Sequence, residues 1–348
     1  TVLIENLGTH ESPPRELRET IEILLRGMSE PFQFQDHLLN MSTSAGIALY
    51  PNDGQSGEQI LSSADAAMYL AKKSGRNSAR YASARITGDL RKQLTIAGEI
   101  RRGIERDEFE PYFQPVVDTT QIRVVGAEAL LRWHHPERGL VFPSEFIGAA
   151  EETGLINSLG ERCLTKAHHQ ATMWNSASRA MSVAVNLSAR QIHDGSILPL
   201  LREIHSRHPK NGFLEFELTE SALLEHSEHS RQALQEIKGM GHRLGLDDFG
   251  TGYSSMSYLQ RLPIDKIKID HSFVAKMDSS RPALAIISAT LALAKSLDLD
   301  VVAEGVETEA QMTRLRDMGC HLQQGYYYSK AIPAVELDAW IHKYESRA

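Results

Sequence analysis

The hydrophobic pattern becomes regular from about residue 110 onward, where short apolar runs alternate with stretches of helical spacing. Eight of these runs have the character of buried strands, because apolar and β-branched residues fill them almost without interruption. They cover residues 110–118, 123–133, 181–188, 213–220, 242–249, 265–270, 298–306 and 320–328. Eight strands joined mostly by helices in roughly 240 residues are typical of a closed barrel. The pattern therefore predicts an α/β fold, a TIM-like (β/α)8 barrel.

The connection between the first two runs is too short for a barrel in which all strands are parallel. Only the four residues 119–122 separate these runs, whereas a parallel crossover needs about a dozen residues or more. The two runs must therefore form an antiparallel hairpin. We expect a barrel with one antiparallel strand.

The residues before the barrel have strand and helix patterns of their own, but too few for a full core. We expect a strand over 1–7, a helix over 13–28, β structure over 38–51 and a helix over 57–75. So few elements form only a thin α/β layer, which indicates part of a domain. The predicted organisation is a partial domain over 1–82, a charged amphipathic linker helix over 83–108 and the barrel over 109–348.

Composition narrows the class of protein without deciding it. The chain has 348 residues and a formal net charge of −8, which argues against a surface for polymeric nucleic acid. Cys163 and Cys320 lie in no metal-binding spacing, so we expect no disulfide framework and a cytoplasmic location. The most apolar helical stretch, 282–297, contains polar residues such as Lys295 and predicts a buried helix rather than a membrane span. Because the first residue is Thr, we expect a piece of a longer protein, which leaves room for membrane or sensor segments upstream.

Polar residues recur at the ends of the later strands, where the apolar pattern does not explain them. The set comprises Glu128, Asn186, Glu217, Asp247, Asp248, Lys268, Glu304 and Gln324. In a barrel of this kind the carboxyl ends of the strands meet at one face, where active sites are built. So many carboxylates cannot stay ionised together without cations, and oxygen-rich clusters of this kind suit Mg²⁺ or Mn²⁺.

The adjacent pair Asp247 and Asp248 suggests two ions rather than one. Asp247 could bridge both ions while Asp248 binds only one of them, so that metal charge offsets the repulsion between the carboxylates. Two hard cations about 4 Å apart are a known arrangement for phosphoester hydrolysis. Lys268 could hold the attacking water or offset phosphate charge, and the loop 250–255 could close over the site with its glycines as hinges.

Each of these residues, taken alone, also has a simpler interpretation. A carboxylate at a strand end is commonly a helix cap, an ion-pair partner or a solvated group, and Asn186 could be a cap. Lys268 could be a surface residue of a short strand. His134 and His135 have no partner at ligand spacing, and we place them in a turn before Pro136. The metal interpretation depends on the recurrence of the set in successive units.

Several segments of the barrel region resemble, in order, the motifs of the EAL-domain cyclic di-GMP phosphodiesterases. They are EALLRW (128–133), FPSEFIGAAEETGLI (142–156), NLSARQ (186–191), ELTE (217–220), DDFGTGYSS (247–255), IKID (267–270), AEGVE (303–307) and QGYYYSK (324–330). The resemblance extends over about residues 105–345. It implies a bacterial signalling enzyme that hydrolyses one phosphodiester bond of cyclic di-GMP and gives linear pGpG.

The resemblance also implies roles for the matching positions. The implied ligands of the first Mg²⁺ or Mn²⁺ ion are Glu128, Asn186, Glu217 and Asp247, and those of the second are Asp247, Asp248 and Glu304. The implied catalytic positions are Glu304, Lys268, Glu220 and Gln324. Among these, Lys268 would orient the attacking water, and Glu220 would anchor the loop after Asp248. The implied substrate-binding positions are Gln114, Leu130, Arg132, Asp270 and Glu307, with Arg132 at a phosphate.

The first part of the chain resembles the C-terminal half of a GGDEF domain, which is diguanylate cyclase-like. Residues 44–51 and 64–77 carry this likeness, and the signature itself is absent from the chain. We therefore expect no cyclase activity. Lys72 and Arg76 match positions that face the nucleotide in that family, and we interpret them here as parts of a structural remnant.

Two other functions stay open on the sequence alone. One alternative is a non-catalytic cyclic di-GMP receptor that signals through a partner, although such EAL domains typically lose a metal ligand and this chain keeps every matched one. The other is a scaffold whose EAL part is active only under control of the first part or of sensors upstream. EAL domains commonly pair through surfaces near the loop after Asp248, so a homodimer is an expectation from the resemblance. His271 and Ala331 depart from the residues common in the family, and neither matches a ligand.

Overall fold

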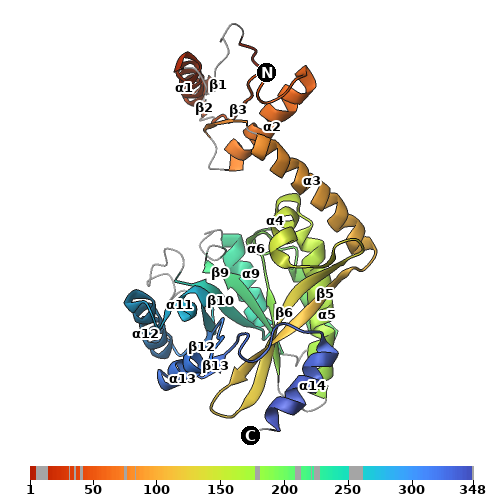
Figure 1. Ribbon diagram of the computed structural model, residues 1–348, viewed down its shortest axis with the longest axis vertical. Coiled ribbons are helices and arrows are strands. Elements are labelled where there is room, and N and C mark those ends of the chain that lie inside the picture. Colours follow the sequence, from red (N-terminus) through yellow and green to blue (C-terminus); the bar gives the residue numbers. More distant parts are fainter. Residues whose placement is uncertain are drawn as a thin grey trace. The chain divides into compact units, whose positions relative to one another are not determined.

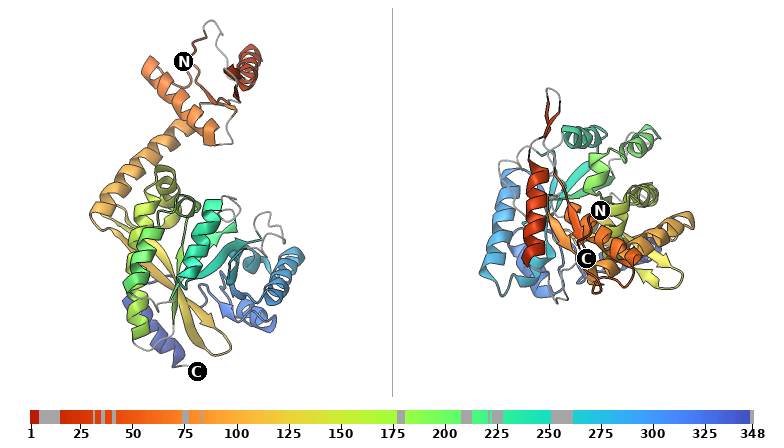
Figure 2. Two further views of the ribbon diagram at one scale, coloured as in Figure 1. Left: turned by 180° about the vertical axis from the view of Figure 1, so that it is seen from behind. Right: turned by 90° about the horizontal axis from the view of Figure 1, so that it is seen from above.

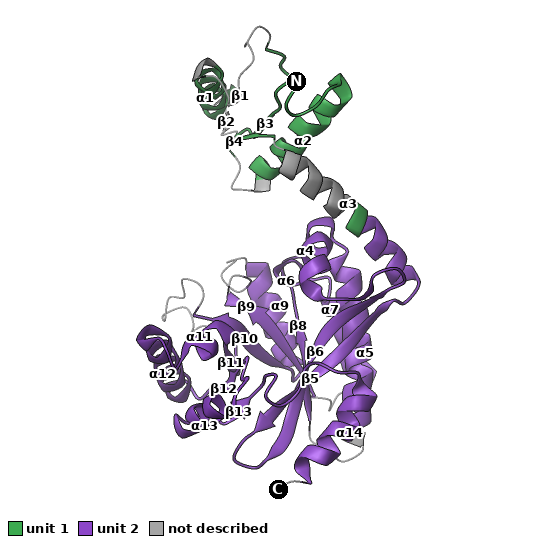
Figure 3. Ribbon diagram, in the orientation of Figure 1, with its two compact units in different colours: residues 1–96 green, residues 97–348 purple. Residues whose placement is uncertain are grey.

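The computed structural model describes most of the chain (Figure 1). The described residues are 1–4, 15–30, 32–34, 37–39, 42–73, 77–82, 84–176, 181–207, 213–220, 222, 228–250 and 262–346. They divide into two compact units, Thr1–Ile96 and Ala97–Ala348 (Figure 3). Helix α3 (Ala84–Glu105) crosses the division between the units.

The second unit is a closed barrel of eight strands. The strands are β5 (Phe109–Asp118), β6 (Arg123–His135), β8 (Ser182–Asn186), β9 (Leu214–Thr219), β10 (Arg243–Phe249), β11 (Lys266–Ile269), β12 (Asp300–Ala303) and β13 (Leu322–Gln323). They pair in the order β6-β8-β9-β10-β11-β12-β13-β5, and the pairing of β5 with β6 closes the ring. Strand β5 is antiparallel to both of its neighbours, β6 and β13, and the other pairs in the ring are parallel. The predicted barrel with one reversed strand is confirmed.

Helices lie on the outside of this barrel (Figure 2). They are α4 (Pro143–Thr153), α5 (Ile156–Ser176), α6 (Ala189–His193), α7 (Leu198–Arg207), α9 (Glu228–Gly239), α11 (His271–Lys276), α12 (Arg281–Ser296), α13 (Glu309–Asp317) and α14 (Ala334–Glu345). Helix α12 shows why they form: the Ser280 side chain caps its amino end by accepting from the backbone N–H of Ala283. Its apolar face, with Ile287 and Ala294 buried, then packs on the barrel, as expected for this stretch.

The hairpin of β5 and β6 is longer than the sequence indicated. A further strand, β7 (Gly139–Val141), pairs antiparallel with the end of β6, so β6 continues to His135. The placement of His134 and His135 in a turn was therefore wrong. His135 is buried, and its Nδ1 accepts from the backbone N–H groups of Glu137 and Arg138 at 3.2 Å each. This histidine closes the β6–β7 turn, which explains its burial without a metal.

Besides the start of α3, the described residues of the first unit form two helices and two small sheets. Its elements are α1 (Arg15–Ser29), β1 (Phe32–Phe34), β2 (His37–Leu39), β3 (Ala45–Ile47), α2 (Gly57–Lys73) and β4 (Ala79–Tyr81). Strands β1 and β2 are antiparallel, and β3 and β4 are parallel. Residues 1–4 have no regular structure, contrary to the expected strand over 1–7, of which 5–7 lie outside the described residues. Lys72 is exposed on α2, and Arg76 lies outside the described residues.

Two expectations about the whole chain can be compared with the structure. Cys163 and Cys320 are both free and buried, so they form no disulfide. Within the described residues, no helix combines the length and the apolar character needed to cross a membrane.

Candidate functional site

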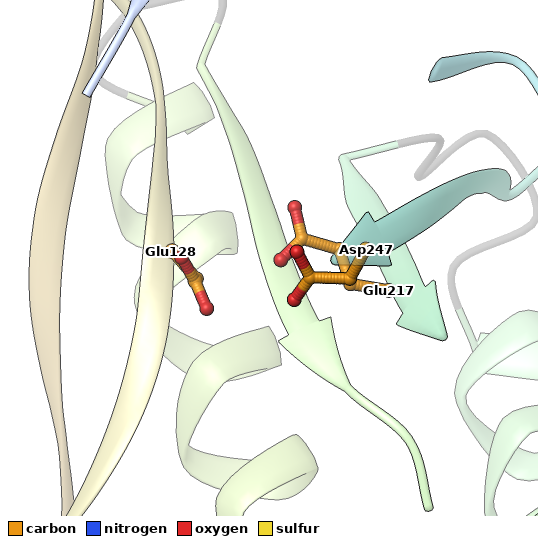
Figure 4. Close-up of side chains that lie close together, drawn as sticks. All are labelled: Glu128, Glu217 and Asp247. Atoms are coloured by element: carbon orange, nitrogen blue, oxygen red, sulfur yellow. The ribbon is translucent and has the colours of Figure 1, made fainter. Parts of the chain in front are cut away.

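A cluster of carboxylates lies inside the barrel, on strands that are distant in sequence. Glu128 on β6, Glu217 on β9 and Asp247 on β10 approach one another there (Figure 4). Glu128 occupies the middle of its long strand rather than the end, opposite Ala184 of β8, which corrects the expected position. The tilt of barrel strands allows a residue in mid-strand to meet residues nearer the ends of other strands.

The carboxylates form two groups that overlap. Glu128, Glu217 and Asp247 can each offer an oxygen such that all three oxygens lie within 4.8 Å of one another. Asp247, Asp248 and Glu304 meet the same criterion. Asp247 belongs to both groups, which is the arrangement expected of a residue that bridges two cations.

Lys268 lies at the centre of this cluster and is almost fully buried. Its Nζ lies 2.6 Å from Glu304 Oε1 and 2.7 Å from Glu217 Oε2. The Nζ–oxygen distances to Glu128 and Asp247 are 3.2 and 3.3 Å. One ammonium therefore faces four carboxylates, so the interpretation of Lys268 as a surface residue was wrong.

A second set of buried charges in the barrel shows that this imbalance is particular to the cluster. Glu215 and Lys266 stand two residues before Glu217 and Lys268, so they face the same interior. They are buried and pair with each other, and Arg243 lies 3.7 Å from Glu215. Arg243 also pairs with Asp300, so two carboxylates face two cations there, which suits structural ion pairs. The cluster around Lys268 instead has an excess of carboxylates, which bound cations would offset.

The excess of carboxylates changes the acid–base properties of the cluster. Burial raises the pKa of Glu217 to about 8, against the opposing effect of the Lys268 ammonium. Burial also raises the pKa of Glu304 well above its ordinary value, and burial together with Asp247 raises that of Asp248. The surrounding carboxylates hold the pKa of Lys268 well above its usual range, although burial alone would lower it. These shifts reflect the burial and mutual repulsion of the carboxylates, which cations bound among them would offset.

Three amide side chains support Glu128. Asn186 Nδ2 donates to Glu128 Oε1 at 2.7 Å, and Gln324 Nε2 donates to Glu128 Oε2 at 2.8 Å. Gln324 Nε2 also donates to Gln114 Oε1 at 3.0 Å, and Gln114 Nε2 donates to the carbonyl of Ser329. These bonds fix the Glu128 carboxylate, and the orientation of the Asn186 amide leaves its oxygen free to act as a ligand.

Asp248 has an unusual backbone conformation that separates its side chain from that of Asp247. Its φ is +54°, a left-handed conformation that aspartate tolerates better than most residues. Its backbone N–H donates to Asp247 Oδ1 at 2.9 Å. The turn allows both adjacent carboxylates to join the cluster. Of the loop expected to close over the site with its glycines as hinges, Gly250 is described, with a φ of +95°, and residues 251–261 lie outside the described residues.

Glu220 is buried just after β9. Among the described residues, neither of its carboxylate oxygens has a hydrogen-bond partner. A buried carboxylate is costly unless it accepts hydrogen bonds. The role of Glu220 as an anchor for the loop stays a prediction.

Arg132 stands four residues after Glu128 in β6, so the two side chains point to the same face of the strand. Its guanidinium carbon is 5.0 Å from the ring centre of Phe142 and 5.8 Å from that of Tyr112. Arg132 Nη1 donates to the carbonyl of Leu131 at 2.9 Å. Within the described residues, no carboxylate forms a salt bridge with Arg132. The positive charge of Arg132 is therefore available to an anion. Neither aromatic residue was predicted as part of the site.

The remaining predicted substrate positions lie in different surroundings. Leu130, with Asn186 and Glu217, lines a cavity of about 390 Å³ that extends between β6, β8 and α5. Asp270 caps α11 by accepting from the backbone N–H of Ser272 at 3.0 Å, which gives it a structural function as well. Glu307 is exposed before α13. The structure thus brings Leu130 to the edge of the cluster and does not by itself give Asp270 or Glu307 a substrate role.

Comparison with protein families gives two matches in this chain. The family model described as "EAL domain" matches residues 97–331. The family model described as "Diguanylate cyclase, GGDEF domain" matches residues 2–78. The first match covers the barrel and every residue of the carboxylate cluster.

Curated relatives share both parts of the chain. "Bifunctional diguanylate cyclase/cyclic di-GMP phosphodiesterase MucR" of Pseudomonas aeruginosa is 39% identical over 94% of this chain and 48% of its own length. "Cyclic di-GMP phosphodiesterase PdeR" of Escherichia coli is 36% identical over 93% of this chain and 49% of its own length. The chain therefore spans about half the length of these relatives.

Solved structures have the same barrel. "PaMucR Phosphodiesterase, c-di-GMP complex" is 39% identical with a TM-score of 0.67, and the match covers 70% of this chain and 100% of that one. "Structure of EAL Enzyme Bd1971 - cAMP and cyclic-di-GMP bound form" is 28% identical with a TM-score of 0.68, covering 73% of this chain and 70% of that one.

Proposed function

This chain belongs to the EAL domain family, and we propose that its barrel is a two-metal phosphodiesterase that hydrolyses cyclic di-GMP to linear pGpG. The observation that carries the proposal is the pair of overlapping carboxylate groups that share Asp247. Relatives named as cyclic di-GMP phosphodiesterases support the choice of substrate. A phosphodiester is an anion, and the available charge of Arg132 beside the cluster suits one.

The donor set of the cluster fits two hard divalent cations. We propose Glu128, Asn186, Glu217 and Asp247 as ligands of the first ion, and Asp247, Asp248 and Glu304 as ligands of the second. All of these ligands offer oxygen, and their excess negative charge over Lys268 favours Mg²⁺ or Mn²⁺. When bound, such ions polarise the phosphodiester and lower the pKa of a water molecule.

The side chains around the cations have distinct tasks in this proposal. Lys268, whose Nζ faces four carboxylates, orients the attacking water as a hydrogen-bond donor. Glu304, whose Oε1 lies 2.6 Å from Lys268 Nζ, is the candidate acceptor of that proton. Arg132 binds a non-bridging phosphate oxygen. Gln324 keeps Glu128 in position through the bond between them.

A turnover assay tests the proposal. Purified protein would be incubated with cyclic di-GMP and Mg²⁺ or Mn²⁺, and the products would be separated by chromatography. We expect linear pGpG with either metal and no product in excess chelator, because the carboxylates need cations to act together. Binding of cyclic di-GMP without turnover in either metal would contradict the proposal and identify a receptor instead.

A further inference from the structure

A cavity of about 230 Å³ lies at the end of the barrel where its parallel strands begin. Its lining includes the first residues of β6, β8, β10, β11, β12 and β13, which are Arg123, Ser182, Arg243, Lys266, Asp300 and Leu322. Asp118, the last residue of the reversed strand β5, lies at the same end. In the carboxylate cluster, Asp247 lies near the other end of β10 and Glu304 lies just beyond that of β12. The cavity is therefore separate from the proposed active site.

The lining of this cavity is small and polar, unlike the usual interior of such a barrel. Bulky apolar side chains normally fill a TIM-like barrel. Here Gly126 and Ala184 contribute little volume, and the buried side chains of Glu215 and Lys266 line the space. Charged groups favour polar contents, because an apolar ligand would offer them no hydrogen bonds. Pockets for drug-sized ligands have volumes of roughly 300–1,000 Å³, so this smaller cavity suits a small polar molecule or an ion.

The carboxylates that line the cavity already have partners. Glu215 and Asp300 belong to the ion pairs described above. Asp118 Oδ1 accepts from the backbone N–H of Thr120 at 2.8 Å and from its hydroxyl at 2.6 Å. Most acceptors of the cavity are therefore used within the fold, which disfavours a cation as its occupant.

Arg123 is a cation at the cavity whose donors are unused. It is exposed, and within the described residues its guanidinium forms neither a hydrogen bond nor a salt bridge. Asp118 stands opposite it in the β5–β6 hairpin and interacts with it only electrostatically. The preceding residue, Ile122, has a φ of +50°, which is unfavourable for a β-branched side chain. Arg123 thus follows a strained turn and presents five free N–H donors beside the cavity.

We propose that this end of the barrel is a binding site for a small oxyanion, such as inorganic phosphate. The guanidinium of Arg123 donates to the anion, and the charges of Arg243 and Lys266 in the cavity wall favour its entry. A dinucleotide is too large for this space, so the ligand is not the proposed substrate. Because the site is assembled from the starts of several strands, the unfolded chain lacks it, and the bound anion stabilises the fold.

The test is calorimetric titration of inorganic phosphate into the whole chain in excess chelator. Sodium chloride would keep the ionic strength constant, so that neither bound metal nor screening contributes. We expect Arg123→Gln to raise the Kd for phosphate on the order of tenfold and Arg123→Glu to abolish binding, because charge-assisted hydrogen bonds are lost. Arg281→Gln is the matched control, since Arg281 is an exposed arginine of α12 that does not line the cavity. It should bind like the parent.

A further variant separates this site from the proposed active site. Arg132→Ala should keep the parental Kd, because Arg132 does not line this cavity. Loss of phosphate binding in Arg132→Ala with parental binding in both Arg123 variants would overturn the proposal and assign the anion to the active site. Absence of phosphate binding in the parent, or equal Kd values in the parent and both Arg123 variants, would also overturn it. Thermal unfolding without phosphate would verify that the variants are folded, as expected for changes at an exposed residue. The proposed hydrolysis of cyclic di-GMP does not enter this test.

Discussion

At the scale of single residues, Asp247 and Asp248 are adjacent in sequence but unequal in position. Asp247 belongs to both carboxylate groups, whereas Asp248 belongs to one. The left-handed turn at Asp248 makes this difference possible, because it lets consecutive carboxylates reach the same space. The two residues should therefore respond differently to the same substitution.

We predict that Asp247→Asn disturbs both metal sites and that Asp248→Asn mainly weakens the second. Either change should lower turnover by more than ~10- to 100-fold, the loss typical when a residue that only supports a metal ligand is replaced. The reason is that both ions are needed for in-line attack. Asp248→Asn should still bind cyclic di-GMP, since other protein contacts to the dinucleotide remain. Mn²⁺ titration with turnover assays would check this. Two retained ions and parental turnover in Asp248→Asn would contradict it.

Arg132 should affect the substrate more than the metals. Its guanidinium presents fixed donors that suit phosphate oxygens, and its partners are aromatic rings and backbone carbonyls. Arg132→Ala should raise the KM for cyclic di-GMP by roughly 10- to 100-fold. Mn²⁺ affinity should stay near that of the parent. If metal binding collapsed as well, Arg132 would instead be a structural partner of the carboxylates.

His242, outside the site, should make folding stability depend on pH. Burial lowers its pKa to about 4 from the ordinary 6.5, and His205 and His168 act in the same direction. The His242 imidazole takes up a proton below about pH 6.5 in the unfolded chain but only below about pH 4 in the folded chain. The free energy of unfolding is therefore highest above pH 6.5 and falls as the pH decreases from about 6.5 to about 4. In His242→Leu, the free energy of unfolding should fall by up to ~3 kcal/mol less over this pH range than in the parent. Denaturant unfolding of parent and variant at pH 7 and pH 4.5 would measure it, and equal declines would disprove the assignment.

Residue by residue, the sequence predicted the cluster better than its surroundings. The recurring polar positions pointed to Glu217 and Lys268, and both lie in the cluster. The same alternation placed Glu215 and Lys266 inside the barrel, which was missed because a buried pair of opposite charges gives no separate signal. Tyr112 was also missed, since an aromatic residue in a strand normally indicates core. The roles of the individual site residues remain proposals.

At the scale of secondary-structure elements, strand length decided what could be predicted. The long apolar runs of the barrel were each found, but the last two were predicted too long, because β12 ends at Ala303 and β13 at Gln323. The three-residue strands β4 and β7 were not found, because so few residues show no periodicity. The consequence was largest for β6, which continues to His135 because β7 pairs with its end.

Two glycines of the first unit should respond in opposite ways to alanine. A Cβ at Gly46 of β3 would lie 1.8 Å from the carbonyl oxygen of Ala64, so the close packing of β3 on α2 requires glycine. Gly27 in α1 has no neighbour within 4 Å of that position. Gly46→Ala should destabilise the unit by about 1–3 kcal/mol, and Gly27→Ala should stabilise it by about 0.5–1 kcal/mol. Calorimetric unfolding would compare them, and similar shifts of one sign would contradict this account of the packing.

At the scale of the whole molecule, the motifs were more informative than composition. Net charge and cysteine content excluded classes of protein but named none, whereas ordered motifs predicted the family that the comparisons confirm. The hydrophobic pattern predicted the closed barrel because its strands are buried on both faces. Oligomeric state and regulation leave no comparable pattern, since they depend on surfaces rather than on a core.

The central claim is that the carboxylate cluster is a two-metal centre in which Asp247 is shared. Anomalous X-ray scattering from crystals of the parent protein grown with Mn²⁺ tests it most directly. The account predicts two Mn²⁺ ions on either side of Asp247, one with Glu128, Asn186 and Glu217 and the other with Asp248 and Glu304. A single ion, or ions bound away from Asp247 at saturating Mn²⁺, would contradict it.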